Sequence, residues 1–175
     1  QQLSMESLGK GVCQNGDDPG APTGPVVWGA TGTEAQHVFF QLLHQGTDVV
    51  PVDFVGLVQM ATGQVDEAQA RKSADLLMTN LVAQADALAF GRTADEVRSD
   101  GVEEALVAHR TFPGDRPSTT VLIPELTPAT LGQLISLYEN RAVAFAALLG
   151  INPFDQWGVE LGKQTARDLA DGPVS

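Results

Sequence analysis

Short runs of β-branched and apolar residues alternate with longer helical patterns along this chain. Residues 49–58 form an almost continuous apolar run, broken only by one proline, one aspartate and one glycine. Such a run is typical of a strand covered on both faces. A helical pattern over residues 66–90 follows, and residues 119–123 are predicted as another strand. Strands joined through helices predict an α/β fold, with a parallel sheet flanked by helices on both sides.

The remaining segments extend this alternation. The sequence predicts one further strand, at residues 25–28, and helices at residues 35–44, 93–101, 127–149 and 155–170. Local chemistry supports the ends of several helices: Gly91 stops the long one, Thr93 with Glu96 forms a capping box, and Thr127 precedes a proline at the first helical position. Residues 9–25 are rich in Gly, Pro and Asp and are predicted as a loop.

Composition narrows the classes of function. Cys13 is the only cysteine, which excludes an internal disulfide and a multi-cysteine metal site and indicates a reducing compartment, the cytoplasm. A net charge of -12 disfavours nucleic acid and anionic lipid, and no apolar run reaches the roughly 20 residues of a membrane span. The first residues carry neither an initiator Met nor a secretory signal, so we expect the chain to begin inside a longer polypeptide.

The turn after Trp28 is the first place where functional side chains are expected, because parallel sheets bind ligands beyond the carboxyl ends of their strands. His37 follows and is predicted in or near the first turn of a helix, whose partial positive charge favours a neutral imidazole. We hypothesise that His37 exchanges protons; the alternative is a histidine that only caps or packs. His44 lies about 10 Å further along the helix, so no shared metal site is predicted.

A second group of polar residues is expected on the last helix. Gln156, Glu160 and Lys163 are spaced by four and three residues, which places an amide, a carboxylate and an ammonium on one helical face. Such a stripe can line a crevice, but Glu160 and Lys163 also fit an ordinary surface ion pair. Glu6 lies beside a loop, where a glutamate is usually solvated.

A ten-residue string near the end of the chain strongly resembles the carboxy-terminal signature of glucose-6-phosphate isomerases. The string is Phe154-Asp155-Gln156-Trp157-Gly158-Val159-Glu160-Leu161-Gly162-Lys163. Other segments are similar to that family in order and spacing: Met5-Glu6-Ser7-x-Gly9-Lys10, Gly24-Pro25-x-Val27-Trp28-Gly29, Gly32-Thr33-x-x-Gln36-His37, Gln41 to Thr47, Ala83-Gln84-x-x-Ala87-Leu88, Arg116-Pro117 and Leu126-Thr127-Pro128. The resemblance covers nearly all of the chain.

The resemblance implies a sugar-isomerase (SIS-type) three-layer domain that is incomplete here, followed by a carboxy-terminal helix. Residues 1–150 are expected to supply most of the second sugar-isomerase domain, and residues 151–175 the signature segment and helix. It also implies isomerisation between glucose 6-phosphate and fructose 6-phosphate through a cis-enediolate, without metal or cofactor. The resemblance further implies that the full enzyme is a homodimer.

Four residues match the family's functional positions. Glu6 corresponds to the general base, and Gln156 to the glutamine that holds the substrate. His37 and Lys163 correspond to the residues that assist opening of the sugar ring, the histidine being donated to the active site of the neighbouring subunit. A carboxylate is a suitable base for removing a proton beside a carbonyl group.

The chain departs from the family in two respects. The loop before His37 reads Ala30-Thr31-Gly32-Thr33-Glu34-Ala35, where the family commonly has Glu-Pro-Gly-Thr-Asn-Gly. The Ser/Thr-rich phosphate-binding loops and the Gly-Gly-Arg segment of the family do not occur, so we expect the 175 residues to be inactive alone. Two other interpretations stay open: a non-catalytic module that binds sugar phosphates, and an acidic structural domain whose matching residues are solvated.

Overall fold

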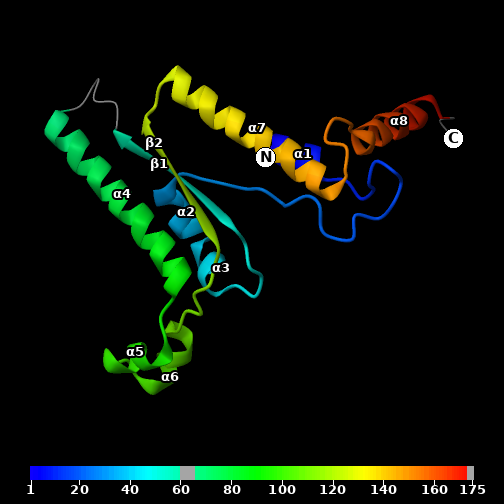
Figure 1. Cartoon of the computed structure of the whole chain (residues 1–175). Helices are drawn as coiled ribbons and strands as arrows, with labels where there is room; N and C mark the ends of the chain where they lie inside the picture. Colours follow the sequence, from blue (N-terminus) through cyan, green and yellow to red (C-terminus); the bar gives the residue numbers. More distant parts are fainter. Residues whose placement is uncertain (60–65, 173–175) are drawn as a thin grey trace. The chain divides into compact units, whose positions relative to one another are not determined.

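The computed structural model describes residues 1–59 and 66–172. They form two compact units, one of residues 29–131 and one of residues 1–28 together with the described residues from 132 onward (Figure 1). Each unit has its own cluster of buried apolar side chains.

The unit of residues 29–131 is built on a two-stranded parallel sheet. Strand β1 (Val52–Gln59) pairs with β2 (Ser118–Glu125), with Val52 opposite Ser118. Helix α4 (Glu67–Phe90) comes between the two strands in sequence and packs on both of them. The predicted α/β class, with a parallel sheet flanked by helices, is confirmed (Figure 1).

The two faces of this sheet differ in how they are covered. On one face a Cβ added to Gly56 would lie 2.7 Å from Leu81 of α4, and Phe54 packs on the apolar cluster. Val55 points to the other face, where its side chain is 45% exposed. Ile123 of β2 pairs with Leu57 and so lies on the same face as Val55, yet it is only 7% exposed. The second face is therefore unevenly buried: Ile123 is covered, whereas Val55 is open.

Helix α4 begins and ends where the sequence predicts. The Asp66 carboxylate accepts a hydrogen bond from the Ala68 N–H, which satisfies one of the free donors of the first turn. At the other end Gly91 has φ +62°, and a Cβ there would lie 2.3 Å from the carbonyl oxygen of Phe112. Glycine is required at this position by both the backbone conformation and the close approach of the next segment.

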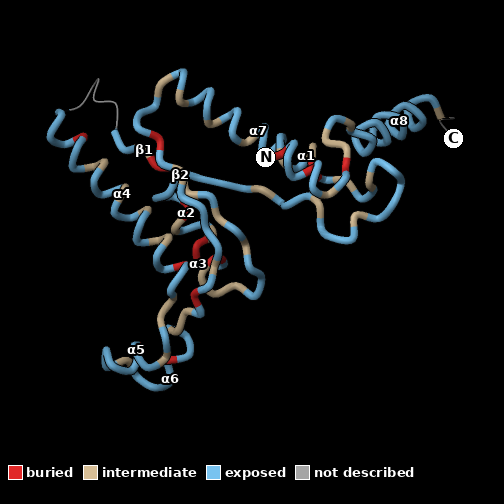
Figure 2. Tube along the Cα trace, viewed as in Figure 1, coloured by how far each residue is buried: buried red, intermediate tan, exposed pale blue. Residues whose placement is uncertain are grey.

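The predicted helix of residues 35–44 is two helices, α2 (Gly32–Val38) and α3 (Phe40–Gln45). The break is at Phe39, whose backbone leaves the helical region at φ −140°, ψ 0°. The change of direction lets both Phe39 and Phe40 reach the apolar cluster, where their rings lie 5.9 Å apart. The buried members of this cluster, drawn red in Figure 2, are Ala35, Phe40, Leu43 and Leu88.

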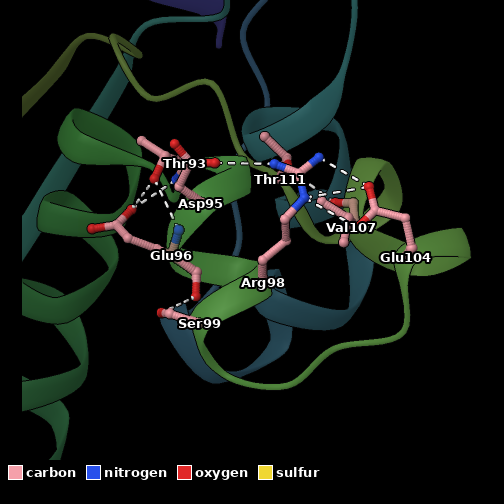
Figure 3. Close-up of polar contacts among 8 residues, drawn as sticks. All are labelled: Thr93, Asp95, Glu96, Arg98, Ser99, Glu104, Val107 and Thr111. Atoms are coloured by element: carbon pink, nitrogen blue, oxygen red, sulfur yellow. Dashed lines mark hydrogen bonds and ion pairs between the residues drawn. The ribbon is translucent and has the colours of Figure 1, made fainter.

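A compact polar segment follows α4 and contains α5 (Ala94–Ser99), α6 (Glu104–Val107) and a short 3-10 turn (Ala108–Arg110). The predicted capping box is present: the Glu96 N–H donates to the Thr93 hydroxyl at 3.3 Å, and the Thr93 N–H donates to the Glu96 carboxylate at 2.8 Å (Figure 3). The bond from the backbone N–H of Thr93, followed by the bond from its hydroxyl, lowers the pKa of Glu96.

The same segment holds a branched ion pair. Arg98 donates from Nε and Nη2 to the Glu104 carboxylate at 3.1 and 3.0 Å, and from Nη1 to Asp95 at 3.0 Å. The hydrogen bonds to Glu104 raise the pKa of Arg98, and the same bonds lower the pKa of Glu104. Arg98 thus joins α5 to α6, two helices that follow one another closely in the sequence (Figure 3).

The other unit is formed by both ends of the chain. It contains α1 (Gln2–Leu8), most of α7 (Pro128–Leu149) and α8 (Trp157–Asp171). Leu8 packs with Ala146 and Ile151, which ties α1 to the end of α7. Helix α7 starts at the predicted cap, because the Thr130 N–H donates to the Thr127 hydroxyl at 3.1 Å.

The loop of residues 9–25 lies against the end of α7. The Gln14 N–H donates to the Gly150 carbonyl oxygen at 2.8 Å, and the Gln14 side-chain amide donates to the Ile151 carbonyl oxygen at 3.2 Å. The Cys13 thiol donates to the Leu149 carbonyl oxygen at 3.3 Å. Hydrogen bonds from residues 13 and 14 to carbonyl oxygens of residues 149–151 therefore connect the two ends of the chain.

The strand predicted at residues 25–28 does not form, which corrects the expected strand, turn and helix before His37. These residues carry no regular secondary structure, and Val26 is 74% exposed. A strand needs a neighbour for its backbone hydrogen bonds, and no described residue pairs with this segment. Of the helices that the structure describes, none is both long and apolar enough to cross a membrane.

Candidate active site

The four predicted site residues are divided between the two units. Glu6, Gln156 and Lys163 belong to the unit formed by the chain ends, and His37 belongs to the unit that contains the sheet. Within the first unit, Gln156 and Lys163 line one hollow, and Glu6 is tied to the segment before Gln156 through its backbone. Among the described residues, no hydrogen bond or ion pair joins the Glu6 carboxylate to Gln156 or Lys163.

Glu6 lies in the last turn of α1, with its side chain partly buried. The helix ends at Gly9, where a Cβ would lie 2.5 Å from the carbonyl oxygen of Met5. Gly24 passes so close that a Cβ on it would lie 2.9 Å from the Cα of Gly9. Two glycines therefore let the loop return against the end of α1.

Lys10 is the residue that connects Glu6 with the signature segment. Its Nζ donates to the carbonyl oxygen of Glu6 at 2.6 Å and to that of Ser7 at 3.4 Å. The same Nζ lies 3.5 Å from Oδ1 of Asp155, the residue that precedes Gln156. The side chains of Lys10 and Asp155 are only 13% and 22% exposed. Both residues lie within the matching motifs, but no local pattern indicates that they meet.

The signature segment is held in shape by its own polar groups. The Asn152 side-chain amide donates to Asp155 Oδ2 at 2.9 Å, and the Phe154 N–H donates to the Asn152 side-chain oxygen at 3.1 Å. Gln156 then takes the N-cap position of α8, and its carbonyl oxygen accepts the N–H of Glu160 at 3.2 Å. The Gln156 side chain makes no capping bond and is exposed, so its amide is available to a ligand.

The three polar residues predicted on one face of the last helix line a common hollow. Gln156, Glu160 and Lys163 share an open hollow of about 320 Å³ with Asp155 and Trp157. A neighbouring hollow of about 550 Å³ also has Glu160 and Lys163 in its lining, together with Arg167. The Lys163 ammonium is not engaged in any of the ion pairs of the described residues. An amide, a carboxylate and two cations on one helix can together bind a polyhydroxylated anion.

His37 is exposed and occupies the last turn of α2, not its first. The argument that the positive end of a helix favours its neutral form is therefore wrong, because α2 begins at Gly32, three residues earlier than the helix predicted for residues 35–44. His44 has a structural environment: its Nε2 lies 3.1 Å from the side-chain oxygen of Gln84, and its ring packs edge-on against Phe112. Within residues 1–59 and 66–172, no cluster of three or more metal-ligating side chains occurs.

Comparison with known proteins gives these residues a context. The sequence model of the family described as phosphoglucose isomerase matches residues 1–174. The chain belongs to the phosphoglucose isomerase family. The glucose-6-phosphate isomerase of Frankia casuarinae is 56% identical to this family member over 169 residues, which are 95% of this chain and 30% of that protein. Glucose-6-phosphate isomerase 1 of Streptomyces avermitilis is 55% identical over 167 residues, again 30% of its length.

A solved structure extends the likeness to three dimensions. The crystal structure of a glucose-6-phosphate isomerase from Chlamydia trachomatis superposes with a TM-score of 0.80 at 38% identity. The match covers 97% of the present chain and 31% of the Chlamydia trachomatis chain. The chain thus spans about 30% of the length of the curated relatives it matches.

Proposed function

We propose that these 175 residues form the carboxy-terminal part of an enzyme that interconverts glucose 6-phosphate and fructose 6-phosphate. Support comes from the family membership and from the placement of Glu6 and the signature segment in one unit, connected by Lys10. The second observation carries the proposal, because a general base and a substrate-holding amide must face the same molecule. The expected boundary at residue 150, between a sugar-isomerase domain and the signature segment, belongs to this proposal.

In the proposed reaction the Glu6 carboxylate removes the proton from C2 of the open-chain aldose. The electron pair of the C2–H bond forms the C1=C2 double bond, and the C1 carbonyl oxygen takes the negative charge of a cis-enediolate. The hydroxyl proton then passes from O2 to O1, the carbonyl group forms at C2, and Glu6 returns its proton to C1, which gives the ketose. The step needs one acid–base group that keeps the proton between the two carbons, and a single carboxylate meets this requirement.

The other residues act before and around this step. Lys163 and His37 assist opening of the sugar ring, and Gln156 holds the substrate through its exposed amide. His37 lies in the other unit, and we propose that it serves the active site of a second subunit in a cytoplasmic homodimer. We propose that the phosphate group is bound by the part of the full-length enzyme that this chain does not include, which corresponds to about 70% of the relatives' length.

The test uses the natural full-length polypeptide that carries this chain. Glu6→Gln should lower kcat by roughly 10²–10⁴-fold, the usual contribution of general acid–base catalysis, while leaving the affinity for fructose 6-phosphate nearly unchanged. Glu103→Gln is the matched control, since Glu103 is exposed and its side chain makes no capping bond. A coupled assay gives the rate, and exchange of the C2 proton with deuterated solvent reports the base directly.

Two results would contradict the proposal. Unchanged turnover in Glu6→Gln would show that Glu6 is not the base. Binding of sugar phosphate without turnover in the unaltered protein would instead favour the non-catalytic module.

A further inference from the structure

We propose that Lys10 is a positioning residue, which clamps the helix carrying Glu6 against the signature segment by bridging the Glu6 carbonyl oxygen and the Asp155 carboxylate. This inference rests on the proposed isomerase function and assigns to it a residue that does not touch the substrate. Two observations support it: the geometry of the bridge and the burial of its charges.

The bridge acts on the backbone of Glu6 itself. The 2.6 Å bond from Lys10 Nζ ends on the carbonyl oxygen of Glu6, so a displacement of Nζ moves the peptide unit from which the carboxylate extends. On its other side, Nζ faces Asp155, which is covalently joined to Gln156. One ammonium group therefore fixes the distance between the backbones of the proposed base and the proposed substrate-holding residue.

Burial makes this contact hard to replace. Oδ1 of Asp155 is buried and accepts no hydrogen bond from the described residues, whereas Oδ2 accepts from Asn152. The Lys10 ammonium, 3.5 Å away, is the charge that compensates Oδ1. When one member of a poorly exposed ion pair is removed, the other is left without compensation, and the local structure rearranges.

The end of α1 is held by two kinds of contact. Among the described residues of the helix, Leu8 is the buried one. Leu8 restrains the end of the helix by apolar packing, which tolerates rotation, while Lys10 adds directional hydrogen bonds to its last carbonyl oxygens.

Catalysis by a positioned base is sensitive to small displacements. A misplacement of about 1 Å can cost about 10²-fold in rate without removing any reacting group. Loss of the clamp should therefore lower kcat more than it changes KM, because Gln156 and Lys163 remain to hold the substrate.

The experiment compares Lys10→Met, Asp155→Asn and the double variant in the full-length isomerase, with Lys72→Met as the control on an exposed face of α4. We expect kcat to fall about 10–100-fold in each single variant, with KM changed less than about threefold. The double variant should be no slower than the slower single variant, because both substitutions remove the same contact. The conservative Lys10→Arg, which keeps the charge and donors, should recover part of kcat.

Other outcomes overturn the inference. If kcat per folded molecule is unchanged in Asp155→Asn, which keeps the side-chain shape, the pair is only structural, even if Lys10→Met fails to fold. If the plateau of kcat/KM against pH is kept and only its acid limb moves, Lys10 acts on the charge of Glu6 and not on its position. If the variants are fully active while Glu6→Gln is inactive, the clamp fails and the proposed function stands; if the unaltered enzyme does not isomerise, the proposed function fails first.

Discussion

The segment of α5 and α6 and the junction between α1 and the signature segment are both held by ion pairs, but the two pairs differ in kind. Arg98 and Glu104 are six residues apart, with side chains 48% and 74% exposed and three hydrogen bonds between them, two from Nε and one from Nη2. Lys10 and Asp155 come from opposite ends of the chain and are 13% and 22% exposed. The local pair has the better hydrogen-bond geometry, yet the distant pair joins the residues proposed to carry the chemistry.

This comparison shows that a shifted pKa does not by itself mark a functional site. The pKa shifts of Glu96, Arg98 and Glu104 all lie in the exposed α5–α6 segment. They result from hydrogen bonds made within a few residues, which stabilise the local segment. In the proposed site, the features that distinguish Lys10 and Asp155 are low exposure and contact between distant segments.

Of the substitutions that test the difference between the two regions, Ile151→Ala in the full-length protein should change the free energy of unfolding most. Ile151 is fully buried in the junction, packed with Leu8 and Ala146. Its truncation removes apolar contacts and leaves a cavity, so the free energy of unfolding should fall by about 2–5 kcal/mol. Denaturant unfolding measures this change. Ile151→Val, which removes a single methyl group, is the control and should cost about 1 kcal/mol. Equal losses in the two variants would contradict tight packing at the junction.

A smaller effect is expected in the local segment from Thr93→Ala. The substitution removes the hydroxyl that accepts the Glu96 N–H and should lower the free energy of unfolding by about 1 kcal/mol. Thr93→Ser keeps the hydroxyl and should be nearly neutral. Isomerase turnover should be unchanged in both variants, because Thr93 lies outside the proposed site. A loss of turnover in Thr93→Ala without loss of stability would connect this segment to catalysis and remove the contrast drawn above.

The same contrast explains which features could be predicted from the sequence. Asp66 and Gly91 at the ends of α4, and the capping box of Thr93 and Glu96, depend on neighbours a few residues away, and the sequence predicts them correctly. The likeness of residues 1–174 to the phosphoglucose isomerase family was also visible in short motifs. Hydrophobic periodicity identified the two strands that pair, although their ends differ by a few residues.

The errors concern contacts between distant segments. The break at Phe39 arises because two adjacent rings both enter the cluster around Leu88, which no local pattern encodes. That break goes with a helix that starts earlier, which puts His37 at its end. Residues 25–28 have strand-forming composition but no pairing neighbour in the described chain. The Lys10–Asp155 contact was missed for the same reason, since each residue looks ordinary in its own motif.

The smallest expected effect is the pH dependence of stability contributed by Glu104. Its pKa is lower in the folded chain than in the unfolded chain because Arg98 hydrogen-bonds the carboxylate. A carboxyl group of this kind contributes stability above its unfolded pKa, near 4.5, and that contribution is lost as the pH falls through the folded pKa. Glu104→Gln removes the titrating group, so the unfolding midpoint of the variant should decline less between about pH 5 and pH 3 than that of the unaltered protein.

The matched control for this prediction is Glu103→Gln, at the neighbouring exposed position, which should keep the original pH dependence. Added salt should reduce the difference between Glu104→Gln and the unaltered protein, because the pair is exposed and its attraction is screened. Thermal unfolding at several pH values measures the effect. A steeper loss of stability in Glu104→Gln at low pH would reverse the sign and show that the Arg98–Glu104 pair opposes folding, in which case good hydrogen-bond geometry would not be a sign of stabilisation even in the local segment.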